Sequence, residues 1–218
     1  MTGFPRSPRL AQAGLVIIDP ETGSIEQVIT LQYASETLKR TLQVQSLADE
    51  PDRSHPLRLT GPAVETITLE AELDATDQLE FPDENAAANE AGIFPQLSAM
   101  EMLVHPTSSQ LTRYGELAAA GTMEILPIET PLALFVWSAN RIVPIRISDL
   151  SISEEFFDTA LNPIRAKVNL SLRVLSVNDL GFKHRGGGLF MAYLKAKENL
   201  AARAKSREYN LLGIGGLP

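Results

Sequence analysis

The sequence predicts a mainly β protein of the α+β class: an antiparallel, tail-tube-like β-sandwich or barrel with one packed helix and a C-terminal helix. Two segments, 66–73 and 167–174, alternate strictly between apolar and polar residues. Such alternation is typical of strands that turn one face to a core and the other to water, as in antiparallel sheets. Helical periodicity is confined to two stretches, one after residue 94 and one after residue 188.

Five further runs read as strands: 14–18, 24–33, 38–44, 132–137 and 142–152. The first two flank residues 19–23, whose Asp, Pro and Gly predict a hairpin turn. A second short turn, 138–141, contains an Asn that tolerates left-handed geometry. Pro144 cannot donate to a ladder, so it predicts a sheet edge or a bulge. The wet faces of the two alternating strands are acidic (Glu70, Glu72) and basic (Lys167, Arg173), and we expect these strands to pair.

The first predicted helix has Pro95 in its first turn and ends before Pro106. Its apolar stripe consists of Leu97, Met100, Leu103 and Val104. Residues 83–91, rich in Ala, Asn and acid, indicate a loop or a weak helix.

The second helix is predicted from Leu189 to about Lys205. Its apolar positions are Leu189, Tyr193, Ala196, Leu200 and Ala204. It follows three consecutive glycines, 186–188, which indicate a flexible hinge rather than a phosphate-binding loop, because no P-loop or dinucleotide fingerprint is present. We therefore divide the chain into a β domain, 1–182, and a basic C-terminal helix with a Gly-rich tail, 183–218.

Composition excludes several classes of protein. The 218 residues include no cysteine, which excludes disulfides, thiolate metal sites and a Cys nucleophile. The opening residues predict no secretory signal, and no apolar run is long enough to span a membrane. The formal charge of −8 argues against general nucleic-acid binding. We expect a cytoplasmic protein that does not insert into membranes.

The charge is distributed unevenly along the chain. Between residues 49 and 124 there are fifteen acidic side chains and three arginines, whereas 183–207 carries seven basic side chains and one acidic. These runs are either two solvated faces or an acidic and a basic end that stack on copies of the chain. On the second interpretation, the candidate assembly contacts are Lys195, Lys197, Arg203, Lys205, Glu70 and Glu72.

The search for catalytic chemistry yields little. The three histidines, His55, His105 and His184, lack metal-ligand spacing, and no G-x-S-x-G is present. The only tryptophan, Trp137, lies in an apolar run typical of a core. We predict no catalytic residue, no metal and no cofactor. A distant His–carboxylate enzyme site stays as a minor alternative.

Several stretches resemble the tube-like proteins of contractile injection systems, which are phage-tail-like particles. These stretches are Leu15–Asp19 with Pro20-Glu21-Thr22-Gly23, Val28–Leu38, Thr60-Gly61-Pro62, Glu65–Leu73 with Asp74-Ala75-Thr76-Asp77, and Pro144–Leu175. The most distinctive is SISEEFFD…LNPIRAKVNLSL. The resemblance spans about residues 12 to 180. The family usually has an aromatic-Asn-Pro triplet where this chain has Tyr33-Ala34-Ser35, and its adaptor members often continue into a LysM module that the basic helix replaces here.

The resemblance implies a structural, non-enzymatic protein. Its expected form is a homohexameric ring at the baseplate that adapts a VgrG-like spike protein to the inner tube protein, or initiates tube assembly, in contact with other baseplate proteins. The alternative from the residues alone is a monomeric β-sandwich module that binds a ligand or carbohydrate.

Overall fold

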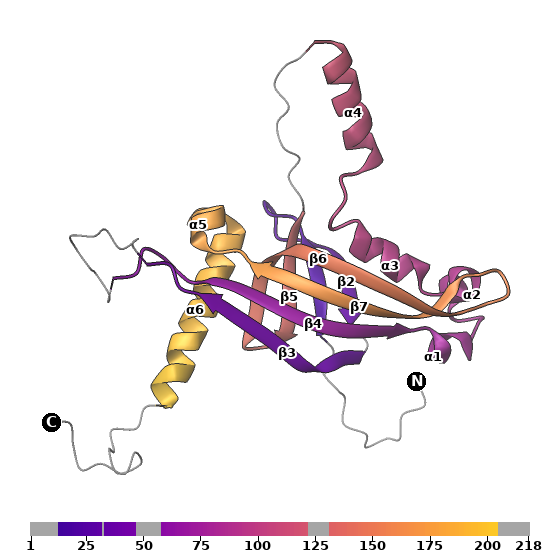
Figure 1. The fold of residues 1–218 in the computed structure, drawn as a ribbon, viewed down its shortest axis with the longest axis horizontal. Coiled ribbons are helices and arrows are strands. Elements are labelled where there is room, and N and C mark those ends of the chain that lie inside the picture. Colours follow the sequence, from indigo (N-terminus) through magenta and orange to yellow (C-terminus); the bar gives the residue numbers. More distant parts are fainter. Residues whose placement is uncertain (1–12, 32, 47–57, 122–130, 205–218) are drawn as a thin grey trace.

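The computed structural model describes residues 13–31, 33–46, 58–121 and 131–204. Seven strands form one antiparallel sheet in the order β2-β1-β5-β6-β7-β4-β3 (Figure 1). The strands are β1 (Ala13–Ile18), β2 (Ile25–Leu31), β3 (Tyr33–Gln43), β4 (Val64–Asp74), β5 (Leu132–Ser138), β6 (Arg141–Phe157) and β7 (Pro163–Val174). The predicted mainly β, α+β class is confirmed. The two edge strands, β2 and β3, do not pair with each other, so the sheet is open rather than a closed barrel.

Six helices accompany the sheet in the described part of the chain: α1 (Thr76–Leu79), α2 (Ala86–Ala91), α3 (Phe94–Glu101), α4 (Ser108–Ala119), α5 (Val177–Leu180) and α6 (Arg185–Arg203). In Figure 1, α6 lies at one end of the sheet and α1 and α2 lie at the other. One apolar core includes Leu31 of β2, Leu69 of β4, Met100 of α3 and Phe190 of α6. The sheet therefore packs on one main core, to which α3 and α6 both contribute, beside a smaller cluster of Ile18, Leu132 and Leu134.

The two strands with strict alternation are neighbours, as predicted. In β4 and β7, Glu72 lies opposite Lys167 in an antiparallel register. Two ion pairs run diagonally: Arg165 contacts Glu72 at 3.2 Å, and Lys167 contacts Glu155 of β6 at 3.1 Å. A third joins directly opposite residues, Arg165 and Asp74, at 2.6 Å. Ion pairs on the solvent-facing side of the central sheet thus link β6, β7 and β4 and help to fix their register.

The predicted first hairpin is confirmed. β1 pairs with β2, and the Asp19 carboxylate accepts hydrogen bonds from the backbone N–H groups of Glu21 and Thr22. These backbone donors, Thr22 first, hold the pKa of Asp19 below its usual value. Gly23 completes the turn with a φ of 76°, a conformation that glycine adopts without strain. The predicted strand 24–33 is too long, since Tyr33 already belongs to β3 at the opposite edge of the sheet.

Pro144 lies inside a paired strand rather than at a bulge. Its partner in β5 is Leu134, whereas the β6–β7 ladder ends at Ile145 and Val174. Leu175, just past the end of β7, donates its N–H to the Pro144 carbonyl. The N–H that proline lacks would point to the same side, beyond the end of the ladder, so the sheet loses no ladder bond there. The bulge in β6 is at Ser148 instead.

The helix predicted at Pro95 is present as α3, with proline in its first turn. Leu97, Met100 and Leu103 of its stripe are buried, whereas Val104 is 40% exposed. The weak helix expected within 83–91 corresponds to α2.

The hinge predicted at the three glycines is wrong. Gly186, Gly187 and Gly188 form the first turn of α6, which begins at Arg185 and is capped by His184. A Cβ on Gly187 would lie 2.0 Å from the Gly181 carbonyl oxygen, so glycine is needed there for close packing. Phe190 and Tyr193 then enter the common core. Helix α6 is therefore part of that core and not a flexible appendage.

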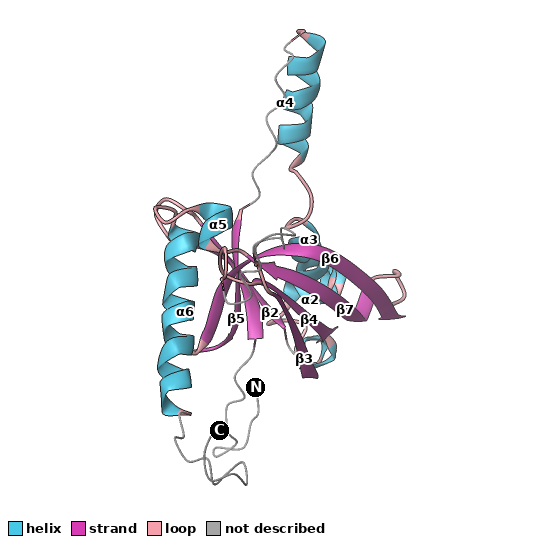
Figure 2. Ribbon diagram, turned by 60° about the vertical axis from the view of Figure 1, so that its left-hand side comes forward, coloured by secondary structure: helices cyan, strands magenta, loops and turns pink. Residues whose placement is uncertain are grey.

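Helix α4 stands away from the sheet in both views (Figures 1 and 2). None of its residues is buried, and Leu111 and Leu117 are 55% and 41% exposed. A capping box starts the helix: Thr107 accepts from the Gln110 backbone N–H, and the Gln110 side chain accepts from the Thr107 N–H. The helix is well initiated locally, and none of its residues is buried in the part of the chain that the structure describes.

Candidate functional site

A buried carboxylate, Glu65, is the centre of the candidate site. In β4 the odd-numbered positions face the core, as Ile67, Leu69 and Ala71 show, and Glu65 is in phase with them. Its side chain is only 4% exposed. A buried carboxylate is costly unless charged partners and hydrogen bonds compensate it, so its surroundings are the first place to look for chemistry.

Two cations and a phenol surround this carboxylate. Arg40 of β3 approaches Glu65 Oε1 at 2.7 Å, and Lys197 of α6 donates to Oε2 at 2.9 Å. The Tyr193 hydroxyl donates to Oε1 at 3.2 Å and also accepts from Arg40 at 3.3 Å. The Lys197 ammonium lies 4.1 Å from the centre of the Tyr193 ring. We call these four residues the Glu65 cluster.

The Glu65 cluster keeps its carboxylate ionised. Burial by itself would raise the pKa of Glu65, but hydrogen bonds and charges from Arg40 and Lys197 outweigh burial and lower that pKa. In return, the hydrogen bond to Glu65 raises the pKa of Arg40. The cluster joins β3, β4 and α6, so it fixes the position of α6 on the sheet as well as the charge state of the site.

A pocket opens beside the Glu65 cluster, between α6 and the β5–β6 turn. It is lined by Arg40, Trp137, Ser138, Asn140, Arg141, Tyr193, Lys197 and Leu200. We call it the cationic pocket, because Arg40, Arg141 and Lys197 face only one buried carboxylate and leave two net positive charges. Within the described residues, Arg141 has no carboxylate within 4 Å.

Trp137 has a dual position. As predicted, it packs against the core, with its ring centre 5.9 Å from that of Phe135. It also lines the cationic pocket. The pocket therefore combines guanidinium and ammonium groups with two aromatic walls, Trp137 and Tyr193, a combination suited to an anionic group on an apolar support.

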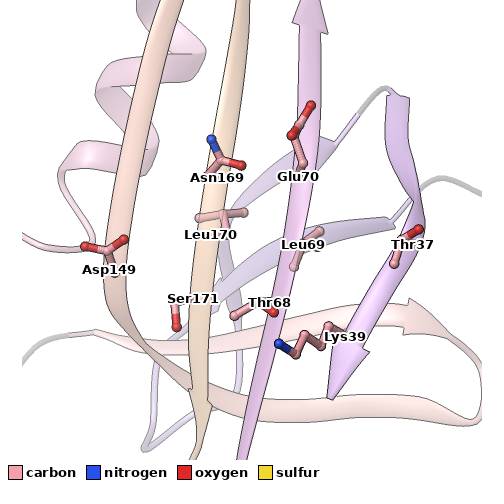
Figure 3. Close-up of a pocket in the computed structure, with 9 residues that line it drawn as sticks. All are labelled: Thr37, Lys39, Thr68, Leu69, Glu70, Asp149, Asn169, Leu170 and Ser171. Carbon is pink, nitrogen blue, oxygen red and sulfur yellow. The ribbon is translucent and has the colours of Figure 1, made fainter. Parts of the chain in front are cut away.

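A second hollow lies on the wet face of the sheet. Figure 3 shows that it runs across β3, β4, β7 and β6. It is lined by Thr37, Lys39, Thr68, Leu69, Glu70, Asp149, Asn169, Leu170 and Ser171. The hollow is open and its lining holds no aromatic ring on which a sugar could stack. It offers polar groups of both charges but no enclosed site.

The structure separates the predicted assembly contacts into different environments. Lys195 and Arg203 are exposed on α6, but Lys197 points inward to Glu65. Glu70 is exposed in the second hollow, while Glu72 is partly buried beside Arg165. Lys205 lies outside the described residues. Lys195 and Lys197, two residues apart, point about 200° apart on a helix and cannot share a surface.

The histidines do not assemble a site in the part of the chain that the structure describes. His184 caps α6, where its Nδ1 accepts from the Gly186 N–H at 3.1 Å. His105 is an exposed loop residue, and His55 falls outside the described residues. No three His, Asp or Glu side chains among those described converge as metal ligands would. No described helix is both long and apolar enough to cross a membrane.

Sequence reasoning missed the Glu65 cluster although one signal was present. Glu65 has the same parity as the apolar positions of its strand, so the alternation already placed it on the core face. The partners could not be found this way, because Arg40 and Lys197 are 25 and 132 residues distant from Glu65 along the chain.

A third feature is an apolar tip on the β6–β7 hairpin. Phe156 and Leu161 are 65% and 75% exposed and adopt φ angles of 54° and 65°. Asp158 holds the turn by accepting hydrogen bonds from the Ala160 and Asn162 backbone, and its pKa is lowered by the Asn162 side chain and these backbone donors. Left-handed backbone at residues other than glycine is costly and marks a turn that its surroundings hold firmly.

Neither a family model nor a curated protein sequence matches the chain significantly.

Proposed function

We propose that the chain is a structural component of a contractile injection system, a phage-tail-like particle. It forms a hexameric ring at the baseplate that connects the spike to the inner tube or initiates tube assembly. The sequence resemblance supports this role over most of the chain, and the mainly β fold is compatible with it. The protein acts in the cytoplasm, where such particles assemble, with the tube and spike proteins as neighbours.

The observation that carries the proposal is the pair of open sheet edges. β2 ends one side of the sheet and β3 ends the other. Both edges expose aliphatic side chains: Ile25 and Val28 on β2 are 67% and 55% exposed, and Leu42 on β3 is 51% exposed. An exposed apolar edge strand is a template for pairing with another chain. A closed ring needs two different complementary surfaces on each subunit, and two unlike edges supply them.

A charged side chain on either edge tests this role. In the native host, Val28→Lys and Leu42→Lys should each abolish particles seen by negative-stain electron microscopy of sedimented lysate. The uncharged Val28→Thr and Leu42→Thr chains serve as matched controls and should support assembly. Circular dichroism of each purified variant establishes that it is folded. Normal particles from both lysine variants would contradict the proposal and favour a monomeric binding module.

Polarity of the ring gives a sharper readout. Each contact joins the β2 edge of one subunit to the β3 edge of its neighbour, so a chain with only its β2 edge blocked can still offer β3. A mixture of the two lysine variants should therefore give hetero-dimers but no closed rings in native mass spectrometry, at concentrations where the unaltered chain forms rings. Closed rings from the mixture would show that the edges are not the contact surfaces.

A further inference from the structure

The molecule has an acidic pole at the end opposite to the cationic pocket. Residues 76–101 contain six acidic side chains and no Lys or Arg. Those of the α1–α2 segment are all exposed, and none forms an ion pair with another described residue: Asp77, Glu80, Asp83, Glu84 and Glu90. We call this segment, 76–91, the acidic pole. Its charge is unopposed within the part of the chain that the structure describes.

Strand β4 separates the two charged regions. It begins beside the Glu65 cluster at Val64 and ends at Asp74, directly before α1. From Glu65 to Asp74 the strand spans about 30 Å at 3.3 Å per residue. Figure 1 accordingly shows α6 and α1 at opposite ends of the sheet. The acidic pole of one chain cannot reach its own cationic pocket.

The chemistry of the cationic pocket selects carboxylates. Glu65 already pairs with Arg40 and Lys197, whereas Arg141 forms no ion pair with any described residue and can offer its donors to a ligand. A planar guanidinium binds a carboxylate through two parallel hydrogen bonds. The partly exposed Trp137 side chain can cover the aliphatic stem of a Glu or Asp side chain. Nucleic-acid phosphate is disfavoured because the chain as a whole carries a charge of −8.

We propose that the cationic pocket, lined by Arg141, Arg40 and Lys197, binds carboxylates of the acidic pole of a second copy of this chain. The inference rests on the proposed ring function and names the contact that sets the orientation of neighbouring copies. Because the two surfaces are unlike and lie at opposite ends, the contact is head-to-tail. Contacts of this kind close into rings or extend as stacks, and they do not form two-fold dimers. The charges fix orientation and speed association, while the open edges supply apolar contact.

The only tryptophan of the chain lines the pocket, so its fluorescence reports on occupancy. The full-length chain is titrated with a blocked synthetic peptide of residues 76–91, at low salt. We expect a saturable change in Trp137 emission that weakens steeply between 50 and 500 mM NaCl, as screening predicts. A control peptide, with every Asp changed to Asn and every Glu to Gln, should give no change.

Two variants assign the binding to the pocket. Arg141→Gln should weaken peptide affinity by about tenfold, the loss of one charge-assisted hydrogen-bonded pair. Arg113→Gln removes the same charge from the exposed α4 and should leave affinity unchanged. The inference is overturned if the acidic peptide causes no change at millimolar concentration. It is equally overturned if the neutral peptide binds as well, or if Arg141→Gln binds normally.

The result is independent of the test of ring assembly. If peptide binding depends on Arg141, the contact between pocket and acidic pole is supported even where the edge variants still form particles. If the peptide does not bind, this contact is refuted even where rings form through the edges. Charge reversal then links the two. Glu84→Arg and Arg141→Glu should each impair self-association. In a mixture of the two chains, both contacts between unlike chains join opposite charges, so association should be restored. Failure of that mixture to associate would contradict the pairing.

Discussion

Replacing Glu65 by glutamine removes the charge of the Glu65 cluster while keeping its shape. The carboxylate accepts from Arg40, Lys197 and the Tyr193 hydroxyl. Hydrogen bonds to charged groups contribute about 1.5–3 kcal/mol each, and breaking one side of a buried pair costs about 3–5 kcal/mol. The Arg40 and Lys197 side chains are 27% and 33% exposed and can rehydrate, so the cost is smaller. We expect Glu65→Gln to lose about 2 kcal/mol of the free energy of unfolding at pH 7.

The pH dependence of this loss has a definite sign. Since the folded-state pKa of Glu65 is lowered, its ionised form stabilises the native state above the unfolded-state pKa, about 4.3. That stabilisation is lost as the pH falls through the folded-state pKa. The difference in unfolding free energy between the unaltered chain and Glu65→Gln should therefore be constant from pH 7 to about 5.5 and narrow below about 4.3.

Urea unfolding at pH 7, 5.5, 4 and 3.5 measures the difference directly. In a thermal scan, 2 kcal/mol corresponds to a fall in Tm of about 4–8 °C for a chain of this size. Glu70→Gln, on the wet face of the same strand, is the matched control and should stay within about 0.5 kcal/mol of the unaltered chain. A Glu65→Gln chain as stable as the control at pH 7, or a deficit that does not narrow in acid, would refute the reasoning.

Two further predictions concern how α6 docks on the sheet. Gly187→Ala should destabilise the fold by about 1–3 kcal/mol, because the new Cβ meets the Gly181 carbonyl, whereas Gly188→Ala, with open space around it, should stabilise by up to about 1 kcal/mol. Thermal midpoints that shift in the same direction would contradict this packing. Phe190→Ala should cost about 3 kcal/mol or more, as Phe190 is 6% exposed, while Phe182→Ala, 75% exposed, should cost less than about 0.5 kcal/mol. Equal urea midpoints for these two variants would place α6 outside the core.

Much of the sheet follows from local pattern. Strict alternation in β4 and β7 gave both strands, their faces and even their pairing, because opposite wet-face charges match only when the two lie side by side. The turn at 19–23 follows from the chemistry of its Asp and Gly. The sheet order could not be predicted this way. β2 and β3 are consecutive in sequence yet form opposite edges of the sheet. Packing of the strands around the core decides their places, and the connection between the two strands does not.

For the helices, local sequence pattern was a poorer guide than for the sheet. A run of three glycines has the lowest propensity for a helix interior, so a hinge is the natural interpretation. Close packing against Gly181 requires the missing side chain at Gly187, and this tertiary contact outweighs propensity. Helix α4 was missed although Thr107 and Gln110 carry a capping-box signal and Leu111, Tyr114 and Ala118 recur at helical spacing.

Helix α6 shows why charge on a helix must be assigned by face before it is assigned a partner. As one basic run, Lys195, Lys197 and Arg203 suggest a single assembly surface. Helical geometry turns Lys197 about 160° away from Lys195 and about 120° away from Arg203, so it shares a face with neither. Glu65 holds Lys197 inward, so substitution of Lys197 perturbs stability and the cationic pocket together. Charge reversal at Lys195 or Arg203 leaves both intact, so these two positions separate an assembly role of the outer face from a folding role of the inner one.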